Sequence, residues 1–264
     1  MAADGADRAD QCGLAGRVVL ISSASGIGEA AAALFIAAGA NVVVVDRNAE
    51  AVAKLHERSS SVLGLNGDLT DEAVCDAAVE AALSEFGRLD ILANVAGLSG
   101  RRQGDGPVHE ASSAGWRHVM DNNVLTAFQM SRAALKPMRA AKAGAIINTA
   151  SVLAYSPAAK HFATHAYAAS KGAIIALTKA MAAYYAEDGI RVNCVSPGLI
   201  ATPMSLRAQS DEETVEYLKR KQPIGPGIGA PTDVASAMLY LASDAAKFVT
   251  GQNLEVAGGW SVTG

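Results

Sequence analysis

Short, continuous apolar runs alternate along the chain with longer segments in which apolar residues recur at helical spacing. An unbroken run is typical of a parallel strand buried on both faces, whereas the longer spacing is typical of an amphipathic helix. We therefore predict strands at 18–21, 42–45, 62–65, 89–92, 145–148 and 192–195, with a last strand near 253–256. The Ala-rich segments between them predict helices at 27–38, 49–58, 71–86, 113–139, 166–187 and 231–242.

This alternation predicts the fold class α/β, with a doubly wound parallel sheet and right-handed crossovers. No linker divides the chain, so we expect residues 1–14 to be a flexible tail and residues 15–264 to be a single domain. Ligands of such sheets bind beyond the carboxyl ends of the strands, which here are the loops after residues 21, 46, 65, 93, 149 and 195. Segment 203–226 has Pro and Gly near its ends and is expected to form a substrate lid.

Composition narrows the possible classes of function. The chain has 264 residues, is 50% hydrophobic and 18% charged, and has a net charge of −4, which suits a large core but not binding to nucleic acid or an anionic membrane. Cys12, Cys75 and Cys194 are far apart in sequence, which argues against a metal site or a disulfide framework. The amino end lacks the apolar region of a signal peptide, and the apolar stretches are too short to span a membrane. We therefore expect a cytoplasmic protein without a metal.

The loop after the first predicted strand has the residues of a phosphate-binding turn. Ser22, Ser25, Gly26, Ile27 and Gly28 lie between that strand and the start of a helix. The two glycines would let backbone N–H groups approach a pyrophosphate at the helix amino terminus. The alternative is an ordinary glycine-containing turn.

Carboxylates follow the second and third predicted strands. Asp46, about 20 residues beyond the glycines, suits hydrogen bonds from both adenosine ribose hydroxyls and would repel a 2′-phosphate, so NAD is favoured over NADP. Arg47 would soften that preference, and Asp46 with Arg47 is alternatively a plain turn. Asp68 would either bond an adenine edge or cap the helix that begins near Asp71.

Tyr167 and Lys171 are four residues apart on a predicted helix, which puts both side chains on one face. A phenol is a poor base near neutral pH because its pKa is about 10, and a nearby ammonium favours the phenolate and lowers that pKa. The positive charge of an oxidised nicotinamide would help further. The pair is a candidate acid/base, although the same spacing also occurs by chance on many helices.

Together these residues resemble the short-chain dehydrogenase/reductase family in its single-domain form. The match runs from about Gly16 to the carboxyl end, through Gly26-Ile27-Gly28, Asp46, Asp68, Asn94-Val95-Ala96-Gly97, Asn123, Ser151, Tyr167, Lys171 and Pro197-Gly198 in that order. The resemblance implies a Rossmann fold, a nicotinamide cofactor and hydride transfer to or from an alcohol or carbonyl carbon. It also implies a homotetramer, with helix 166–187 facing a partner.

The resemblance further implies roles for individual residues. Tyr167 moves the hydroxyl proton, and Lys171 lowers its pKa and binds the nicotinamide ribose. Ser151 bonds the substrate oxygen, and Asn123 holds a water in the proton relay. The implied cofactor contacts are Ser22, Ser25, Gly26, Ile27, Gly28, Asp46, Arg47, Asp68, Leu69, Asn94, Ala96, Gly97, Tyr167, Lys171, Pro197, Gly198, Ile200 and Thr202.

The chain also departs from the family pattern. Ile21-Ser22 stands where the family usually has Thr-Gly, and the Cβ of Ser22 is expected to lower cofactor affinity or to make the turn adjust. Val95 replaces an Asn, and Ala257 replaces an Asp. The interval from Ser151 to Tyr167 is longer than usual by a few residues near 160–162.

We conclude that the sequence predicts an NAD-dependent dehydrogenase that interconverts a secondary alcohol and a ketone on a small-molecule substrate. Two alternatives are an NADP-dependent reductase of 3-oxoacyl thioesters and a dinucleotide-binding regulator without turnover. His161 and His165 are expected to be loop or substrate-rim residues. Arg101 and Arg102 would either meet an acidic group of the substrate or be solvated.

Overall fold

Seven parallel strands form one sheet in the order β3-β2-β1-β4-β5-β6-β7. The computed structural model describes residues 12–225 and 227–263. The strands are β1 (Val18–Ile21), β2 (Asn41–Asp46), β3 (Val62–Asn66), β4 (Ile91–Asn94), β5 (Gly144–Thr149), β6 (Ile190–Pro197) and β7 (Asn253–Val256). The strand order reverses between β1 and β4, and in a doubly wound sheet this switch point is where ligands bind.

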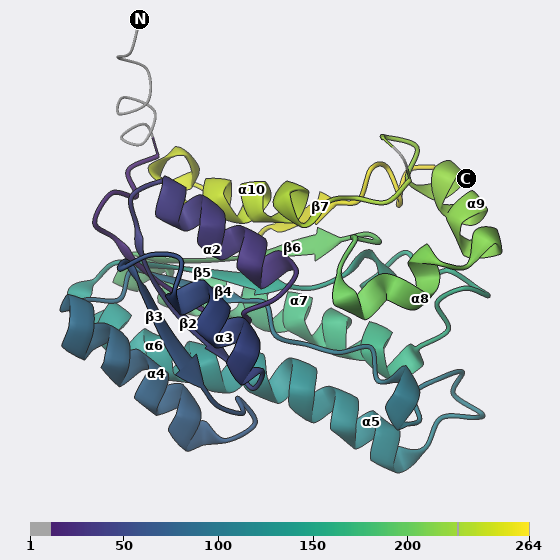
Figure 1. The fold of residues 1–264 in the computed structure, drawn as a ribbon, viewed down its shortest axis with the longest axis horizontal. Coiled ribbons are helices and arrows are strands. Elements are labelled where there is room, and N and C mark those ends of the chain that lie inside the picture. The colour runs from purple at the N-terminus through teal and green to yellow at the C-terminus, as the bar shows by residue number, and fades with distance from the viewer. Residues whose placement is uncertain (1–11, 226, 264) are drawn as a thin grey trace, which may run out of the picture.

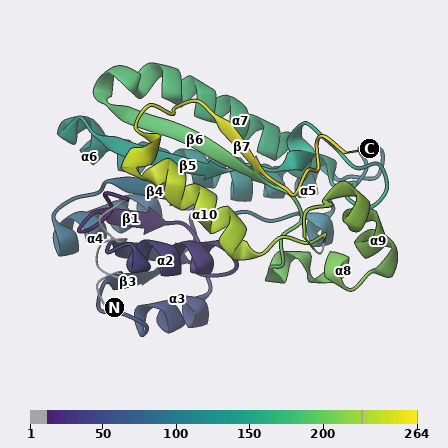
Figure 2. The same ribbon diagram turned by 90° about the horizontal axis from the view of Figure 1, so that it is seen from above.

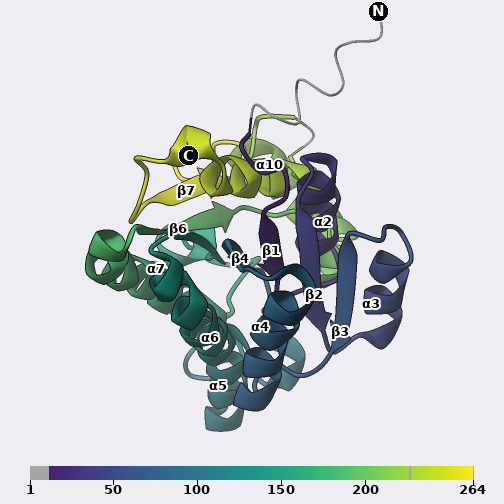
Figure 3. The same cartoon turned by 90° about the vertical axis from the view of Figure 1, so that its left-hand side faces the viewer.

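Helices cover both faces of the sheet (Figures 1 and 3). One layer contains α2 (Ile27–Ala37), α3 (Ala49–His56) and α10 (Pro231–Ala242), and the other contains α4 (Glu72–Phe86), α6 (Thr126–Ala141) and α7 (His165–Tyr185). The short helix α5 (Ser113–Met120) precedes α6. Two further helices, α8 (Leu206–Gln209) and α9 (Glu212–Lys221), lie beyond the carboxyl ends of the strands (Figures 1 and 2).

The continuous apolar runs are explained by this three-layer arrangement. In β1, Val19 and Ile21 belong to the core beneath α2 and α10, whereas Val18 and Leu20 belong to the core beneath α4 and α6. All four side chains are 0% exposed. Burying one such side chain contributes about 1.5–3 kcal/mol, so both faces of each central strand stabilise the sheet.

The fold class and the single domain are confirmed, and each predicted strand is present with shifts of a few residues. The helix predicted at 113–139 instead consists of α5, a π-helical turn at Asp121–Leu125 and α6. The packed chain also begins before residue 15, because Leu14 is 0% exposed and the Asp244 N–H donates to the Cys12 carbonyl. The rest of the predicted tail, residues 1–11, lies outside the described residues.

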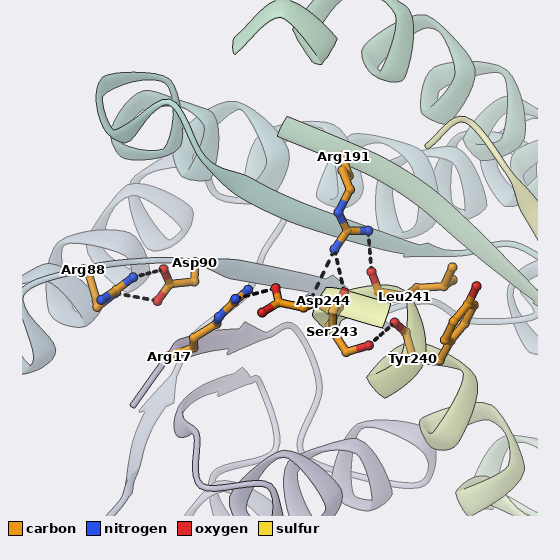
Figure 4. Close-up of polar contacts among 9 residues, drawn as sticks. Arg17, Arg88, Asp90, Arg191, Tyr240, Leu241, Ser243 and Asp244 are labelled. Atoms are coloured by element: carbon orange, nitrogen blue, oxygen red, sulfur yellow. Dashed lines mark hydrogen bonds and ion pairs between the residues drawn. The ribbon is translucent and has the colours of Figure 1, made fainter. Parts of the chain in front are cut away.

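Arginines tie the elements together at the amino ends of the strands (Figure 4). Arg17 pairs with Asp244 at 2.6 Å, and Arg88 pairs with Asp90 at 2.6 Å. Arg191 in β6 donates to the carbonyls of Leu241 and Ala242 at 2.6 and 3.2 Å. Because the last carbonyls of a helix have no partners within it, Arg191 satisfies the end of α10 and anchors it to the sheet.

Candidate active site

Two adjoining cavities open at the carboxyl ends of the strands, with volumes of about 610 Å³ and about 220 Å³. Their walls come from the loops that follow β1 to β6, as the sequence predicts. Both are lined by Ser23, Ser25, Arg47, Gly97 and Leu98, so they form one elongated site.

The two glycines of the first turn, Gly26 and Gly28, have different structural roles. Gly26 lines the larger cavity and has a φ of +55°, which a non-glycine residue rarely adopts. Gly28 lines neither cavity among the described residues, and its N–H already donates to the Ser25 carbonyl at 3.0 Å. A Cβ at position 28 would lie 2.3 Å from the Ser23 carbonyl oxygen. Gly26 is therefore open to a ligand, whereas Gly28 is needed to close the turn.

Ser22 is accommodated without strain. Among the described residues only Lys142 combines a side chain with a positive φ, so the backbone of Ser22 is ordinary. Its hydroxyl accepts the N–H groups of Val95 and Ala96 at 2.8 and 3.1 Å. The side chain thus joins β1 to the end of β4. Of the two expectations for Ser22, an adjusted turn is compatible with these bonds, and lower cofactor affinity stays a prediction.

Asp46 anchors the same turn from β2. Its carboxylate accepts the Ala24 N–H at 2.8 Å and the Asn48 N–H at 2.9 Å, and it lines the smaller cavity. Arg47 lines both cavities and its guanidinium donates to the Asn122 side chain at 3.4 Å.

Asp68 and Leu69 also line the smaller cavity. Asp68 accepts hydrogen bonds from the backbone N–H and then the hydroxyl of Thr70, and these lower the pKa of its carboxyl. Asp71, rather than Asp68, caps α4 by accepting the Ala73 N–H at 2.9 Å. Asp68 is thus an ionised group that faces the cavity and not a helix cap.

Tyr167, Lys171 and Ser151 line the larger cavity together. Helix α7 carries the first two, and the Lys171 Nζ is 5.6 Å from the centroid of the Tyr167 ring. The ammonium donates to the Thr149 carbonyl at the end of β5 at 2.8 Å. Ser151 follows the same strand two residues later, so one strand end and one helix face bring the three groups together.

Asn123 lies behind this group. It is 0% exposed and does not line either cavity. Its amide accepts the Leu98 N–H at 2.8 Å and donates to the Leu98 carbonyl at 3.0 Å and to the Ser170 hydroxyl at 2.9 Å. The side chain therefore braces α7 against the loop after β4, and a role in holding a relay water stays a prediction.

Burial has the largest effect on the pKa values of Tyr167 and Lys171, the two candidate groups on α7. Burial raises the pKa of Tyr167, and the Ser151 hydroxyl partly opposes this by lowering it. Burial also lowers the pKa of Lys171 to about 8, against a smaller opposite effect of the Cys194 thiol. The sequence analysis predicts that Lys171 lowers the pKa of Tyr167. In the chain without a cofactor, burial outweighs that effect, because burial also disfavours the charged form of the lysine.

The Asn94 side chain forms hydrogen bonds with other buried side chains. Its amide donates to Asn148 at 2.8 Å and to Ser131 at 3.1 Å, and Asn148 donates on to Thr178 at 2.8 Å. Asn94 lines neither cavity. This buried network joins β4, β5, α6 and α7 beneath the site, so a cofactor contact by the Asn94 side chain has no support from the geometry.

The remaining predicted contacts lie on the cavity walls. Ala96 lines the smaller cavity, and the larger one is lined by Ile27, Pro197, Gly198, Ile200 and Thr202. Gly97 lines both, and a Cβ there would lie 3.1 Å from the Asn123 Oδ1 and 3.3 Å from the Lys171 Nζ. Glycine at position 97 therefore lets the two catalytic candidates approach the loop.

Three contributing residues carry no signal that the sequence analysis used. Trp260 lines the larger cavity, is 1% exposed and donates its indole N–H to the Ser156 carbonyl at 2.8 Å. Gln222 accepts the Leu199 N–H at 2.6 Å and so fixes the loop after β6. Asp105 accepts the N–H groups of Ala166 and Tyr167 at the start of α7. The turn Gly258-Gly259 before Trp260 is the one local hint of a buried aromatic there.

The two histidines stay outside the cavities. The His161 ring stacks on Tyr217 with centroids 4.6 Å apart, and His165 accepts the Val108 N–H at 3.1 Å. Within residues 12–225 and 227–263, no group of three or more His, Cys, Asp or Glu side chains is arranged to hold a metal. In the same part of the chain, no helix combines the length and apolarity that crossing a membrane requires.

Comparison with known proteins agrees with this geometry. A family model described as "Enoyl-(Acyl carrier protein) reductase" matches residues 21–261. The chain is 39% identical to momilactone A synthase from Oryza sativa subsp. japonica, over 96% of this chain and 93% of the relative. It is 38% identical to cis-4-hydroxycyclohexanecarboxylate dehydrogenase from Sinomonas cyclohexanicum, over 92% and 95%.

A solved structure of a short-chain type dehydrogenase/reductase from Mycobacterium ulcerans superposes with a TM-score of 0.86 at 31% identity, covering 94% of this chain and 90% of that one. The similarity therefore extends over sequence and fold alike and spans nearly the whole length of each protein. The chain belongs to the short-chain dehydrogenase/reductase family.

Proposed function

We propose that this protein is an NAD-dependent oxidoreductase that transfers a hydride between a secondary alcohol and the nicotinamide, with Tyr167 as the acid/base. One observation carries the proposal: Ser151, Tyr167 and Lys171 line a single cavity that continues past Gly97 into the cavity lined by Asp46. The dehydrogenase from Sinomonas cyclohexanicum supports an alcohol substrate.

The residues of the elongated site fit a dinucleotide. Gly26 offers a turn without a side chain, next to Thr202, where a Cβ would lie 3.1 Å from the Thr202 Cγ2. At the other end the Asp46 carboxylate suits two ribose hydroxyls and disfavours a 2′-phosphate. The nicotinamide would lie in the larger cavity, bordered by Pro197, Gly198 and Ile200. When bound and oxidised, it supplies the hydride acceptor and a positive charge.

The chain's own groups account for the movement of the proton. The Ser151 hydroxyl donates a hydrogen bond to the substrate oxygen, and the Tyr167 oxygen takes the hydroxyl proton as the alkoxide develops. The Lys171 ammonium, held by the Thr149 carbonyl, stabilises the phenolate electrostatically. Asn123 holds α7 in register with the loop after β4, so that the tyrosine and the lysine keep their relative positions.

The wall of the larger cavity favours a cyclic or otherwise bulky alcohol. Leu153, Phe162, Leu199 and Trp260 line it, and the Phe162 and Trp260 rings meet edge to face at 5.8 Å. Such a surface excludes water and binds an apolar ring by burial. Arg47, which lines both cavities beside Asp46, is the observation that favours NADP as the second candidate cofactor.

Oxidation of a panel of secondary alcohols that includes cis-4-hydroxycyclohexanecarboxylate, with NAD and with NADP in parallel, tests the proposal. Tyr167→Phe should abolish turnover and leave NAD affinity nearly unchanged. Tyr155→Phe is the matched control, because Tyr155 lies outside both cavities and bonds Glu255 instead. If the turnover of Tyr167→Phe is within about tenfold of wild type, Tyr167 is not the acid/base. A strong preference for NADP would overturn the cofactor assignment.

The proposal includes a homotetramer in the cytoplasm. Three large aromatic side chains on α5, α6 and α7 are exposed: Trp116 at 43%, Phe128 at 47% and Tyr184 at 71%. Exposed aromatic groups on neighbouring helices suit a subunit interface. A monomer in sedimentation velocity would contradict this part of the proposal.

A further inference from the structure

The larger cavity is lined by cationic groups without any carboxylate. Arg47, Arg101, Arg102, Lys171 and Arg207 line it, and its described lining contains no Asp or Glu. Lys171 faces the catalytic tyrosine, and Arg47 borders the smaller cavity beside Asp46. The other three, Arg101, Arg102 and Arg207, line the larger cavity only.

These three arginines come from two separate segments. Arg101 and Arg102 lie on the 3₁₀ turn Arg101–Gln103 after β4, and Arg207 lies on α8. Arg101 and Arg207 line the same cavity and both are exposed to solvent. Partial burial and then the positive charge of Arg207 lower the pKa of Arg101. The fold therefore places like charges from two segments on the wall of one cavity.

No ion pair neutralises these charges in the part of the chain that the structure describes, although Arg207, after the hydrogen bonds from Thr214, lowers the pKa of the Asp211 carboxyl. There, Arg101 and Arg102 make neither an ion pair nor a side-chain hydrogen bond, and Arg207 donates only to the His161 carbonyl at 3.3 Å. The carboxylate that acts on Arg101 is Asp105, whose two oxygens accept the N–H groups of Ala166 and Tyr167 at 2.9 Å. Asp105 is thus engaged at α7, and the arginine pair retains its capacity for an anion.

We propose that Arg101 and Arg207 bind an anionic group, a carboxylate, carried by the alcohol that Tyr167 deprotonates. This inference rests on the proposed function. A guanidinium binds a carboxylate through parallel N–H···O bonds, so the pair would orient the substrate as well as attract it. Phosphates of the cofactor are the other source of the same chemistry. Arg47, which borders both cavities, is nearer to that role.

A matched pair of substrates separates charge from shape: cis-4-hydroxycyclohexanecarboxylate and its neutral carboxamide, each with saturating NAD. The wild type should have a higher kcat/KM for the acid. Arg101→Gln and Arg207→Gln should each lower the ratio of the acid value to the carboxamide value by about fivefold to tenfold, through the KM for the acid. Arg220→Gln is the control, because Arg220 is an exposed arginine on α9 outside the cavity.

Two outcomes would overturn the inference while the proposed function stands. Equal kcat/KM for acid and carboxamide in the wild type would show that no anion is recognised. A raised KM for NAD in the variants, with the acid preference kept, would assign the arginines to the cofactor phosphates.

A binding measurement keeps the inference testable if neither alcohol is turned over. Calorimetric binding of cyclohexanecarboxylate to wild type with NAD, lost in the Arg101→Gln/Arg207→Gln double variant, would support the anion site. No binding to wild type would refute it. A failure of the proposed function has a different signature, which is the absence of turnover with every alcohol of the wider panel.

Discussion

The carboxylate of Asp105 accepts the backbone N–H of Tyr167 at 2.9 Å, and its other oxygen accepts the N–H of Ala166 at 2.9 Å. Asp105 is buried and lies between Gly104, with a φ of +89°, and Gly106, whose carbonyl accepts the His165 N–H. The first N–H groups of a helix lack partners within it, and the helix dipole favours a negative charge there. The loop after β4 therefore fixes where α7 begins and, with it, the position of the phenol.

Asp105→Asn should lower turnover by about tenfold and the free energy of unfolding by about 1–2 kcal/mol, because one charged cap is replaced by a neutral one. NAD affinity should stay close to wild type, since Asp105 lines neither cavity. Steady-state kinetics, urea unfolding and NAD titration measure the three quantities. Glu110→Gln is the control, because this acid in the same loop is exposed and pairs with His109 instead of capping α7. Wild-type kcat in Asp105→Asn would show that the cap does not position the tyrosine.

Gly97→Ala should reduce turnover by about tenfold while the protein stays folded. The new Cβ would lie 3.1 Å from the Asn123 Oδ1 and 3.3 Å from the Lys171 Nζ, and both side chains are held by hydrogen bonds that restrict their movement. The matched control is Gly172→Ala in α7, where nothing lies within 4 Å of the added Cβ. That change should stabilise the helix by up to about 1 kcal/mol. Kinetics and thermal unfolding of the two variants make the comparison, and equal activity in both would contradict the tight approach at Gly97.

Lys171 should give the protein, measured without nucleotide, a stability that rises with pH. Burial lowers its pKa from the ordinary 10.5 to about 8, so between these values the unfolded chain binds more protons than the folded one. The free energy of unfolding should therefore rise by up to about 3 kcal/mol from about pH 8 toward about pH 10.5. Below the folded pKa of about 8, the protein carries the full cost of burying the charged lysine.

Lys171→Met removes the titrating group and keeps most of the side-chain volume. Urea unfolding of both proteins across this pH range tests the assignment. The rise should be present in the wild type and absent in the variant. Parallel curves would mean that Lys171 is not desolvated in the folded protein.

The boundary between α5 and α6 could not be predicted from the apolar periodicity. The apolar spacing at 113–139 is that of one continuous helix, but five residues, Asp121–Leu125, form a π-helical turn. A π turn leaves the residue types unchanged and shifts only the hydrogen-bond register, so its sequence looks helical. The turn contains Asn123, and the side chain of Asn123 joins α7 to Leu98.

Apolar runs predicted the strand ends, and the spacing of Tyr167 and Lys171 predicted that they share one face of α7, because both patterns depend on residues within one element. They did not predict contacts between distant loops. The Ser22 hydroxyl bonds the N–H groups of Val95 and Ala96 across more than seventy positions, and Asp105 bonds residues about sixty positions away. Such pairings follow from the sheet order, and no short pattern in the sequence records them.

The double role of Asp46 has a consequence for engineering. Its carboxylate holds the Ala24 and Asn48 N–H groups, so it organises the turn that precedes α2 as well as facing the smaller cavity. A redesign toward a phosphorylated ribose that simply deletes this acid would also release the turn that we propose as the pyrophosphate site. A successful variant therefore needs a replacement acceptor for Ala24, such as a serine or asparagine at position 46, before any new basic residue is introduced.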